Sequence, residues 1–571
     1  MFEMALVLAV FAVLVVPAGR YLYNTAAGKP VFGETVFSRA ESFIYKLCSI
    51  DLKEMNWKHY AAALVLANAA AVFICYLLLR FQHSLFLNPN NIGAMEPALS
   101  FNTVISFATN TDLQHYAGES ALSYLSQTAV ITFLMFFSAA TGGAAFMAFI
   151  RALSGASETV GNYYSDMVRI TTRILLPLSA IVCVLLMWQG VPQNFKKTFT
   201  VNTIESKLQD IQTGPVASLE SIKHLGNNGG GFFSAGSASP FENPTPLSNI
   251  IEILSMMILP GACVVAFGIM MSERKKEKPR LSNAGVNESK SIFLVMGVIF
   301  VLLLALCYAA EKMPNHAFSV SGAGTHSWNM EGKETRFGAA QTALFTIVST
   351  AFTTGSVNNM HDTLNPLGGL AALSGMMLNV VFGSVGAGLM NMIMYVLLAV
   401  FLCGLMIGRT PEYLGKKIEA REMQLAALVL IIHPLLILSF SALAVSAKAG
   451  LAGISNPGFH GFTQVLYEFS SSAANNGSGF AGLHNNTLFW NFTTGIVMFF
   501  ARYAVLVLQL VVAGSLLSKR RLNESSGTLR TDTLTFAVML LFTVFVFNAL
   551  TFLPAVSLGP AAEHLNLYVH G

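Results

Sequence analysis

Charged residues are scarce in this sequence. They make up 11% of the 571 residues, whereas hydrophobic residues make up 54% and the mean hydropathy is +0.59. Soluble globular chains carry about 25% charged residues, so a soluble globular protein is excluded. A helix that spans a bilayer needs about 20 apolar residues. Ten stretches meet this need, at approximately 2–18, 60–80, 121–150, 170–188, 247–271, 291–310, 371–407, 423–447, 487–517 and 533–555.

Cysteine and the motifs of common enzymes are also scarce. The six cysteines are scattered, form no CxxC pair and are expected to be small buried apolar residues. The sequence has no GxxxxGK(S/T) loop, no HExxH, no GxSxG and no Asp-Lys-Thr-Gly-Thr phosphorylation site. We therefore expect no catalytic site, no bound nucleotide and no transition-metal site in this chain. If transport uses ATP, another polypeptide must hydrolyse it.

Lysine and arginine gather after every second apolar stretch, at 151–173, 274–280, 409–421 and 519–521. The positive-inside rule places such clusters on the cytoplasmic side, so both termini are expected outside. The first apolar stretch lacks a basic segment before it and is followed by Arg20 and Lys29. This order predicts a retained membrane anchor rather than a cleaved signal peptide.

Four short polar phrases resemble one another. Each follows an apolar segment expected to be helical, at about 98–108, 219–225, 342–352 and 462–473. These segments are too short to cross a bilayer, which is typical of re-entrant loops. The phrases are Thr109-Asn110-Thr111-Asp112, Asn227-Asn228-Gly229-Gly230, Thr353-Thr354-Gly355-Ser356 and Asn475-Asn476-Gly477-Ser478.

The four phrases together predict a pore. Irregular backbone at membrane depth is tolerated only where protein encloses it or where it lines a wet cavity. Four loops can enclose one another only by meeting at a centre, where backbone carbonyls replace the hydration shell of a monovalent cation. One such loop alone would be interpreted as a flexible solvent loop, but four at matched positions favour a selectivity filter.

The predicted fold class is therefore an all-α polytopic membrane protein. About ten transmembrane helices would form four pseudo-fourfold repeats of span, pore helix, loop and span around one pore. The N-terminal span and its cytoplasmic connection are expected at 1–58, and the C-terminal span and external tail at 531–571. The repeats are expected at 59–152, 166–272, 288–408, with a broken second span, and 421–518.

The loops differ in chemical detail. We align them on Thr111, Gly229, Gly355 and Gly477, because glycine adopts positive φ without steric cost and lets backbone approach an ion. Asp112 is the only carboxylate in the four phrases, and we expect it to stay hydrated at the outer mouth and to concentrate cations there. The flanking residues three positions after the aligned ones are Gln114, Phe232, Asn358 and Phe480.

Two further features of the spans point to a gate or barrier. The stretches 121–150 and 371–407 are too long for simple spans and should tilt, bend or break. Gly383, Gly386 and Gly388 in the second stretch either unwind the helix at mid-membrane or allow tight helix packing. A charge such as Arg502 costs about 2.5–3.5 kcal/mol at a helix centre, so it faces the pore as a barrier, forms an ion pair or snorkels.

Across essentially its whole length, the sequence resembles the family of potassium-translocating subunits (KdpA) of bacterial Kdp complexes. That family belongs to the superfamily of potassium transporters that includes the Trk, Ktr and Hkt proteins. The resemblance rests on the runs FNTVISFATNTDLQ, HLGNNGGGFFSAGSASPFENPTPLSN, AFTTGSVNNMHD and SSAANNGSGF. The Phe-Glu-Asn-Pro sequence at 241–244 is specific to this family.

The resemblance implies a channel-like subunit for high-affinity potassium uptake in the bacterial inner membrane, with both termini periplasmic. Its implied partners are a P-type ATPase catalytic subunit, a small single-span subunit and a periplasmic-side accessory subunit; no nucleic acid is expected. It also implies that the four phrases select potassium and that Gln114 influences affinity. The loop at Gly383 to Gly388 and the charge of Arg502 would then lie below the filter, and Asp112 departs from the amide expected at its position.

Two alternatives belong to other functional classes. A self-sufficient channel or ion-coupled symporter of the wider superfamily would also lack ATP-binding motifs, but the Phe-Glu-Asn-Pro run and the two extra spans favour the first interpretation. An intramembrane enzyme would need paired catalytic groups at membrane depth, and the sequence offers no such pair.

Overall fold

The computed structural model describes residues 2–155, 158–277, 288–314, 328–408, 410–520 and 529–569. The basic residues Arg280, Arg409 and Arg521 of the expected cytoplasmic clusters lie outside the described residues. Within the described part, ten helical segments are long and apolar enough to cross a membrane. The predicted number of spans is therefore confirmed.

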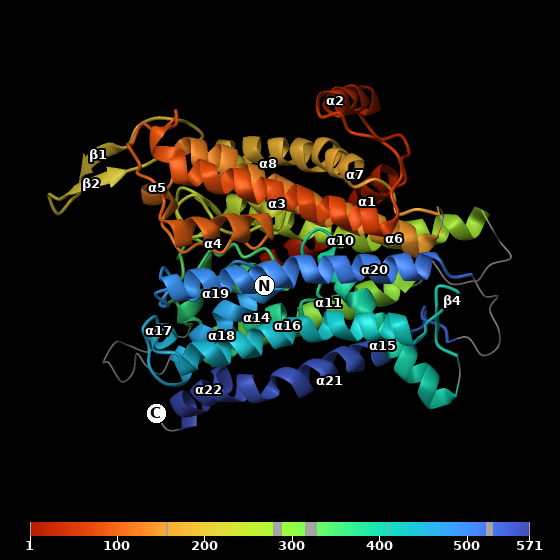
Figure 1. Ribbon diagram of the computed structural model, residues 1–571. Helices are drawn as coiled ribbons and strands as arrows, with labels where there is room; N and C mark the ends of the chain where they lie inside the picture. Colours follow the sequence, from red (N-terminus) through yellow and green to blue (C-terminus); the bar gives the residue numbers. More distant parts are fainter. Residues whose placement is uncertain are drawn as a thin grey trace.

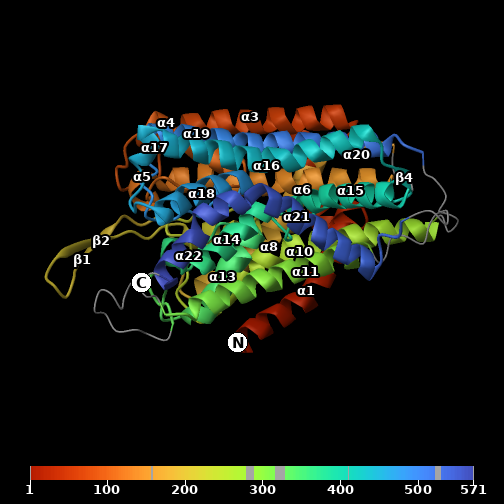
Figure 2. The same cartoon turned by 90° about the horizontal axis from the view of Figure 1, so that it is seen from below.

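The spans lie side by side with their axes roughly aligned (Figures 1 and 2). Each is built from one helix or from helices joined end to end. They are α1 (Phe2–Ala26), α3 (Trp57–Phe81) with η1 (Gln82–Ser84), η2 (Ser126–Thr132) with α6 (Phe133–Ser154), α7 (Tyr163–Ile170) with η3 (Thr171–Leu175) and α8 (Leu176–Trp188), α10 (Pro246–Glu277), α11 (Glu288–Glu311), α15 (Ala387–Ile407), α16 (Ala420–Ser446), α19 (Leu488–Phe499) with η5 (Phe500–Ala504) and α20 (Val505–Leu517), and α21 (Leu534–Leu558).

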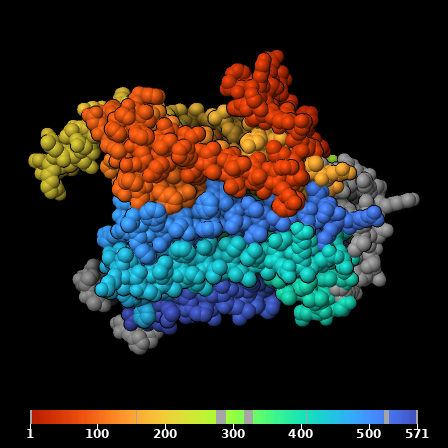
Figure 3. All heavy atoms as spheres, in the orientation of Figure 1, coloured from red at the N-terminus to blue at the C-terminus, as the bar shows by residue number. Residues whose placement is uncertain are grey.

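Shorter elements complete the chain. Figure 3 shows the β1–β2 hairpin and α2 standing out from the packed spans. These elements are α2 (Glu34–Leu47), α4 (Pro97–Ala108), α5 (Gly118–Ala121), β1 (Phe199–Asn202), β2 (Leu208–Ile211), α9 (Val216–Leu225), α13 (Gly338–Ala351), η4 (His361–Thr363), α14 (Pro366–Leu378), β3 (Glu412–Tyr413), β4 (Lys416–Lys417), α17 (Lys448–Leu451), α18 (Phe459–Ala474) and α22 (Pro560–Val569).

Four short helices, α4, α9, α13 and α18, lie where the re-entrant pore helices were predicted. The start of α4 is fixed by its sequence. Pro97 opens α4, where its missing N–H costs nothing, and the Glu96 carboxylate accepts a hydrogen bond from the Leu99 N–H at 2.8 Å. Nearly every residue of these helices is buried, so protein encloses their polar ends as membrane depth requires.

The two overlong stretches behave differently. The stretch 371–407 is divided into α14 and α15 by irregular backbone at 379–386, which confirms the predicted break. The stretch at 121–150 is not broken, since the π-helical turns of η2 lead directly into α6. Arg502 lies in η5, another π-helical segment inside a span. Such segments often occur at functional sites because the extra residue reorients side chains.

Both termini are tied to the pore-helix side of the molecule. The Gln341 amide of α13 donates to the Glu3 carboxylate at 2.6 Å, and His460 of α18 binds Glu563 of α22 at 2.8 Å. With an even number of described spans, the two ends of the chain therefore lie on the same side.

Candidate functional site: a ring of four re-entrant loops

The four loops leave their pore helices in the same way. In each, one backbone N–H reaches a carbonyl five residues earlier in the pore helix. The bonds run from Thr111 to Ser106 at 2.9 Å, from Asn228 to Lys223 at 2.9 Å, from Thr354 to Ser349 at 2.8 Å and from Asn476 to Ser471 at 2.9 Å. These four residues are therefore structurally equivalent.

This equivalence corrects the sequence alignment of the first loop by one residue. Thr111 matches Asn228, Thr354 and Asn476, so Asp112 occupies the position of the three glycines. The φ angle of Asp112 is 56°, beside 104° for Gly229, 82° for Gly355 and 102° for Gly477. A non-glycine residue with positive φ was not anticipated there. With the corrected alignment, the first loop's counterpart of Phe232, Asn358 and Phe480 is His115 rather than Gln114.

The position before the equivalent residues is also left-handed in every loop. It holds Asn110, Asn227, Thr353 and Asn475, with φ between 50° and 61°. Asparagine tolerates this conformation better than most residues, and its amide can bond locally. Each loop therefore has two left-handed residues, one on either side of the equivalent position.

The loops contact one another in a closed ring. A Cβ built on Gly229 would lie 2.5 Å from the Thr354 carbonyl oxygen and 3.0 Å from that of Asn476. On Gly355 it would collide with the Asn476 carbonyl, and on Gly477 with the Thr111 carbonyl. The first loop also contacts the second, which completes the ring. A Cβ on Gly230 of the second loop would lie 3.0 Å from the Asp112 carbonyl oxygen of the first. Only glycine allows the three loops to approach this closely.

Side-chain amides hold the loops from behind. The Asn110 amide donates to the Asn227 carbonyl at 2.6 Å, and the Asn227 amide donates to Thr354 Oγ1 at 2.8 Å. The Asn475 amide donates to Thr111 Oγ1 at 2.9 Å. These amides join loop 1 to loop 2, loop 2 to loop 3 and loop 4 to loop 1, so hydrogen bonds between neighbouring loops fix the ring.

The other predicted filter residues are buried at the same ring. Thr109 Oγ1 lies 2.8 Å from Thr111 Oγ1, and Ser478 Oγ lies 2.8 Å from the Tyr467 hydroxyl. Ser356 contacts His224 of the second pore helix at 3.0 Å. The sequence thus identified residues that the fold brings together from four separate segments.

The flanking residues have unlike partners. The Gln114 amide donates to the Gly231 carbonyl at 3.0 Å, and the Asn358 amide donates to Asn249 at 2.9 Å. Phe480 stacks on Tyr467 at 4.2 Å, whereas Phe232 packs against Phe233 at 4.9 Å. The ring is therefore fourfold in its backbone and asymmetric in its outer shell.

Asp112 is buried beside the ring, whereas the sequence predicts a solvated position at the outer mouth. It is 0% exposed, and within the described part of the chain neither carboxylate oxygen has a hydrogen-bond partner. It borders an outer cavity of about 600 Å³ together with Gln114, Gly230, Gly355 and Gly477. An unpaired buried carboxylate is costly unless a cation compensates it.

The broken span lies directly under the third loop. The Ser384 N–H donates to the Phe352 carbonyl at 2.7 Å, and the Phe382 ring stacks on that of Phe352 at 4.9 Å. Gly383 and Gly386 have φ angles of 41° and 91°. The Gly388 N–H donates to the Gly383 carbonyl at 2.7 Å, which closes the turn. Gly383 and Gly386 therefore lie in an unwound loop below the ring, and Gly388 lies in the first turn of α15.

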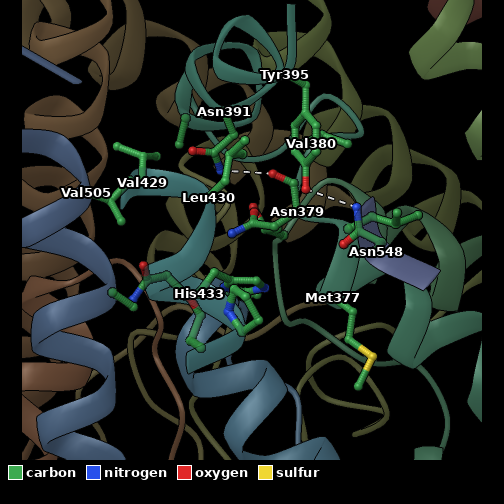
Figure 4. Close-up of a pocket in the computed structure, with 18 of the residues that line it drawn as sticks. Met377, Asn379, Val380, Asn391, Tyr395, Val429, Leu430, His433, Val505 and Asn548 are labelled. Atoms are coloured by element: carbon green, nitrogen blue, oxygen red, sulfur yellow. Dashed lines mark hydrogen bonds between the residues drawn. The ribbon is translucent and has the colours of Figure 1, made fainter. Parts of the chain in front are cut away.

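Below the ring lies a smaller cavity, of about 60 Å³, which reaches the filter residues Thr353 and Asn475. Figure 4 shows Asn379, Asn391, Tyr395 and Asn548 around it, on elements far apart in the sequence. The Gln509 amide donates to Asn391 at 2.8 Å and the Asn548 amide to the Tyr395 hydroxyl at 3.0 Å. A polar space below a ring of carbonyls can hold a cation that has passed the ring.

Arg502 borders the same lower cavity. Its side chain is 4% exposed, and Nη2 lies 3.4 Å from the Ser138 carbonyl oxygen. Among the described residues no carboxylate lies within salt-bridge distance of it, so neither snorkelling nor a close ion pair accounts for this charge. Asp112 acts on it electrostatically across the ring.

Comparisons with known proteins assign the chain to a family. The family model for the potassium-transporting ATPase A subunit, KdpA, matches residues 5–565. The chain belongs to the KdpA family. It is 53% identical over 566 residues to the potassium-transporting ATPase potassium-binding subunit of Clostridium acetobutylicum, with 99% of each chain covered.

A second KdpA relative is the protein of the same description from Geobacillus kaustophilus, at 51% identity over 566 residues and with 99% of each chain covered. Among solved structures, the chain is similar to the potassium transporter TrkH from Vibrio parahaemolyticus. That match has a TM-score of 0.49 and 13% identity, and it covers 76% of this chain and 84% of that one.

One cluster at the outer end of this KdpA chain was not foreseen from the sequence. His460, at the start of pore helix α18, binds Asp362 at 3.0 Å through Nε2 and Glu563 at 2.8 Å through Nδ1. These two contacts of His460 join pore helix α18 to the loop after filter loop 3 and to the C-terminal helix α22. Nothing in the spacing along the sequence predicts that Asp362, which follows filter loop 3, pairs with His460.

The protonation of this cluster favours the folded state. Burial lowers the pKa of His460, but hydrogen bonds to Asp362 and Glu563 outweigh burial and raise that pKa to about 10. Burial acts to raise the pKa of Asp362, but hydrogen bonds from His460 and Gln464 hold it below its ordinary range. An imidazolium that donates from both nitrogens thus connects three segments.

This cluster predicts a pH-dependent contribution to stability. Because the folded pKa of His460 lies above the unfolded value of about 6.5, its contribution is fully present below pH about 6.5. It declines as the pH rises and is lost as the pH passes about 10. Thermal unfolding of the wild type and of His460→Gln should therefore differ most near pH 6.5 and converge towards pH 10. A difference that stays constant over this range would contradict the assignment.

Proposed function

We propose that this chain is the channel-like subunit of an ATP-driven, high-affinity potassium uptake complex. It selects potassium at the ring of four loops and passes the ion into the membrane, while a P-type ATPase subunit hydrolyses ATP. A small single-span subunit and a periplasmic-side accessory subunit complete the complex. The chain lies in a bacterial inner membrane with both termini in the periplasm, and it binds no nucleotide itself.

The closed ring carries this proposal. Backbone from all four loops meets there, since Gly229 lies beside the Thr354 and Asn476 carbonyls and Gly477 lies beside the Thr111 carbonyl. Oxygen ligands held by the protein suit a cation that gives up its water. The relatives' printed names, which describe potassium-binding subunits of a potassium-transporting ATPase, support potassium as that cation.

The loops are short and mutually unlike, so we propose one principal ion site in place of a queue of ions. A channel filter stacks several carbonyl rings and conducts by knock-on between sites. One tight site suits a slow pump that scavenges scarce potassium. The repeats at 59–152, 166–272, 288–408 and 421–518 would each supply one quarter of this site, and the segments 1–58 and 531–571 would flank it.

The ion path continues into the lower cavity. Thr353 and Asn475 border the cavity from above, while the loop at Gly383, Gly386 and Gly388 and the charge of Arg502 limit passage below. Arg502 repels a second cation and so prevents free leakage. The cavity's lining by α15, α16, α20 and α21 supports an ion path that turns sideways towards a partner subunit.

Gly477→Ala tests the ring. The added Cβ collides with the Thr111 carbonyl, so potassium-stimulated ATP hydrolysis by the complex purified through this chain should need at least about tenfold more potassium, equivalent to about 1.4 kcal/mol. Gly458→Ala is the matched control: its φ of 87° is also left-handed, but a Cβ there meets nothing within 4 Å.

Three outcomes of this experiment distinguish the functions. A shift in Gly477→Ala alone supports the filter and the ATPase partner together. Equal potassium dependence in both variants and the wild type would remove the ring from the ion site. Purification of the chain without an ATPase, with passive potassium flux in liposomes, would show an autonomous channel instead.

Asp112→Asn tests the buried carboxylate. Removal of a negative charge that borders the outer cavity should weaken potassium binding by about tenfold at low potassium, since one charge at close range in a poorly solvated site is worth more than about 1 kcal/mol. Isothermal titration or potassium-dependent ATP hydrolysis measures this shift. Asp210→Asn, on the exposed β2 strand, should leave the binding unchanged; equal values for all three proteins would exclude Asp112 from the site.

Arg502→Ala tests the barrier. Loss of the fixed positive charge below the ring should increase ATP-independent thallium or potassium flux through reconstituted complexes by about tenfold or more, because like charges repel strongly in a low-dielectric path. Arg502→Lys keeps the charge and should remain as tight as the wild type. If Arg502→Ala assembles normally and leaks no more than Arg502→Lys, Arg502 has only a structural role.

A further inference from the structure

A second cluster of chemically active side chains lies behind loops 2 and 3, away from the ion ring. It consists of Glu220 and His224 on pore helix α9, Glu252 on α10, and Ser237 in the connection between them. All four are 0% exposed. Glu220 and His224 are four residues apart, which places them on one face of α9. None of them contributes a backbone carbonyl to the ring.

The orientation of His224 gives its Nε2 a lone pair that can bind a metal in place of the hydrogen bond it makes with Ser356. Its Nδ1 lies 2.8 Å from the carbonyl oxygen of Glu220, so Nδ1 carries the proton and donates it to that oxygen. Nε2 of the neutral ring then has a lone pair. Histidines that bind metals commonly donate their other ring N–H to a backbone carbonyl or carboxylate in this manner.

Glu252 provides independent support for a cation at this cluster. Within the described part of the chain, neither carboxylate oxygen of Glu252 accepts a hydrogen bond of regular geometry, although Ser237 interacts with the carboxylate, and the residue is 0% exposed. Oε2 lies 3.4 Å from His224 Nε2, which directs the unpaired carboxylate into the cluster. Buried charges in proteins are normally paired or coordinate a metal.

The separations between the possible ligand atoms match those around one small ion. His224 Nε2 lies 3.4 Å from Glu252 Oε2 and 3.3 Å from Ser237 Oγ. Ser237 Oγ lies 3.4 Å from Glu220 Oε2. A tetrahedral ion with bonds of about 2.0–2.2 Å holds neighbouring ligand atoms about 3.3–3.6 Å apart. One ligand atom each from Glu220, His224 and Glu252 can be chosen within 4.8 Å of one another.

We propose that Glu220, His224 and Glu252 form a binding site for a divalent transition-metal ion of the zinc type, with the Ser237 hydroxyl as a fourth ligand. The site is separate from the potassium ring. One imidazole and two carboxylates suit zinc or manganese, whereas calcium and magnesium sites are built from oxygen ligands. The motifs of the sequence predict no such site, because two ligands share one short helix and the third comes from the next span.

One ammonium group lies among the carboxyl groups of this cluster. Lys223 Nζ pairs with Glu220 Oε2 and donates to Ser237 Oγ at 3.1 Å. The nearby Arg336 is paired with Glu334 at 3.3 Å. Glu252 is not paired with Lys223 in this way, so a metal ion can compensate its carboxylate.

A metal here would connect two filter loops. Ser356, the last residue of the third filter phrase, lies 3.0 Å from His224 Nε2 and 3.1 Å from Ser237 Oγ. The Ser237 N–H also donates to the Val357 carbonyl at 2.6 Å. The ion would thus fix the chain that follows loop 2 against the chain that follows loop 3, and it would stabilise the folded state by mass action.

Metal analysis of the purified full chain, with the subunits that accompany it, tests the proposal. The protein is treated with a chelator, loaded with zinc chloride or manganese chloride, freed of excess metal and analysed by mass spectrometry. The wild type should retain about one ion per chain, with imidazole and oxygen ligands in its X-ray absorption spectrum. Glu252→Gln, which keeps the shape of the side chain, should lose at least about nine-tenths of that metal.

Glu311→Gln is the matched control. Glu311 is another fully buried carboxylate near the outer side, but it pairs with Lys333 at 2.8 Å and belongs to a different cluster. It should retain the metal, and zinc should raise the unfolding temperature of the wild type and this control but not of Glu252→Gln. A wild-type protein that stays monodisperse and retains no more zinc or manganese than Glu252→Gln would overturn the proposal. Equal metal in all three proteins would place the ion elsewhere and overturn it too.

Discussion

The structure depends on one constraint. Backbone carbonyls at membrane depth must be enclosed by protein, yet some of them must remain without a protein hydrogen-bond donor so that they can bind a cation. A lipid environment does not tolerate unsatisfied peptide groups, so the four re-entrant loops survive only by surrounding one another. The glycines at 229, 355 and 477 allow that approach, because a side chain at Gly355 or Gly477 would collide with the next loop's carbonyl. The asparagine amides form hydrogen bonds with the neighbouring loops behind the ring. In the proposed function, a cation is the partner of the ring's carbonyls.

The ring is fourfold in its backbone, and its surroundings break this symmetry along the pore. Asp112 replaces the glycine of loop 1 and adds a buried negative charge at the outer side, while Arg502 adds a buried positive charge at the inner side. In the function that we propose, an entering cation is attracted above the ring and repelled below it. Such an arrangement favours capture and retention over free flow, as a pump that waits for ATP hydrolysis requires.

Hydropathy predicted the ten spans, the four pore helices and the break before α15, since burying each apolar stretch in lipid is a strong signal that needs no tertiary context. The alignment of loop 1 failed by one residue because glycine is the usual sign of positive φ, and Asp112 adopts it without being glycine. The His460–Glu563 pair could not be foreseen, because it joins residues 103 positions apart. The same holds for Glu252, whose position opposite His224 follows from helix packing and not from spacing along the chain.

The most direct measurement of the central claim is the anomalous scattering of thallium or rubidium, as potassium substitutes, in crystals of the complex that contains this chain. The account predicts one dominant peak at the centre of the ring, within bonding distance of the backbone carbonyls around Thr111, Asn228, Thr354 and Asn476, and no row of equally occupied peaks along the axis. Several peaks of full occupancy would contradict the single-site pump. A ring without a peak, beside ions bound elsewhere in the membrane region, would contradict the filter itself.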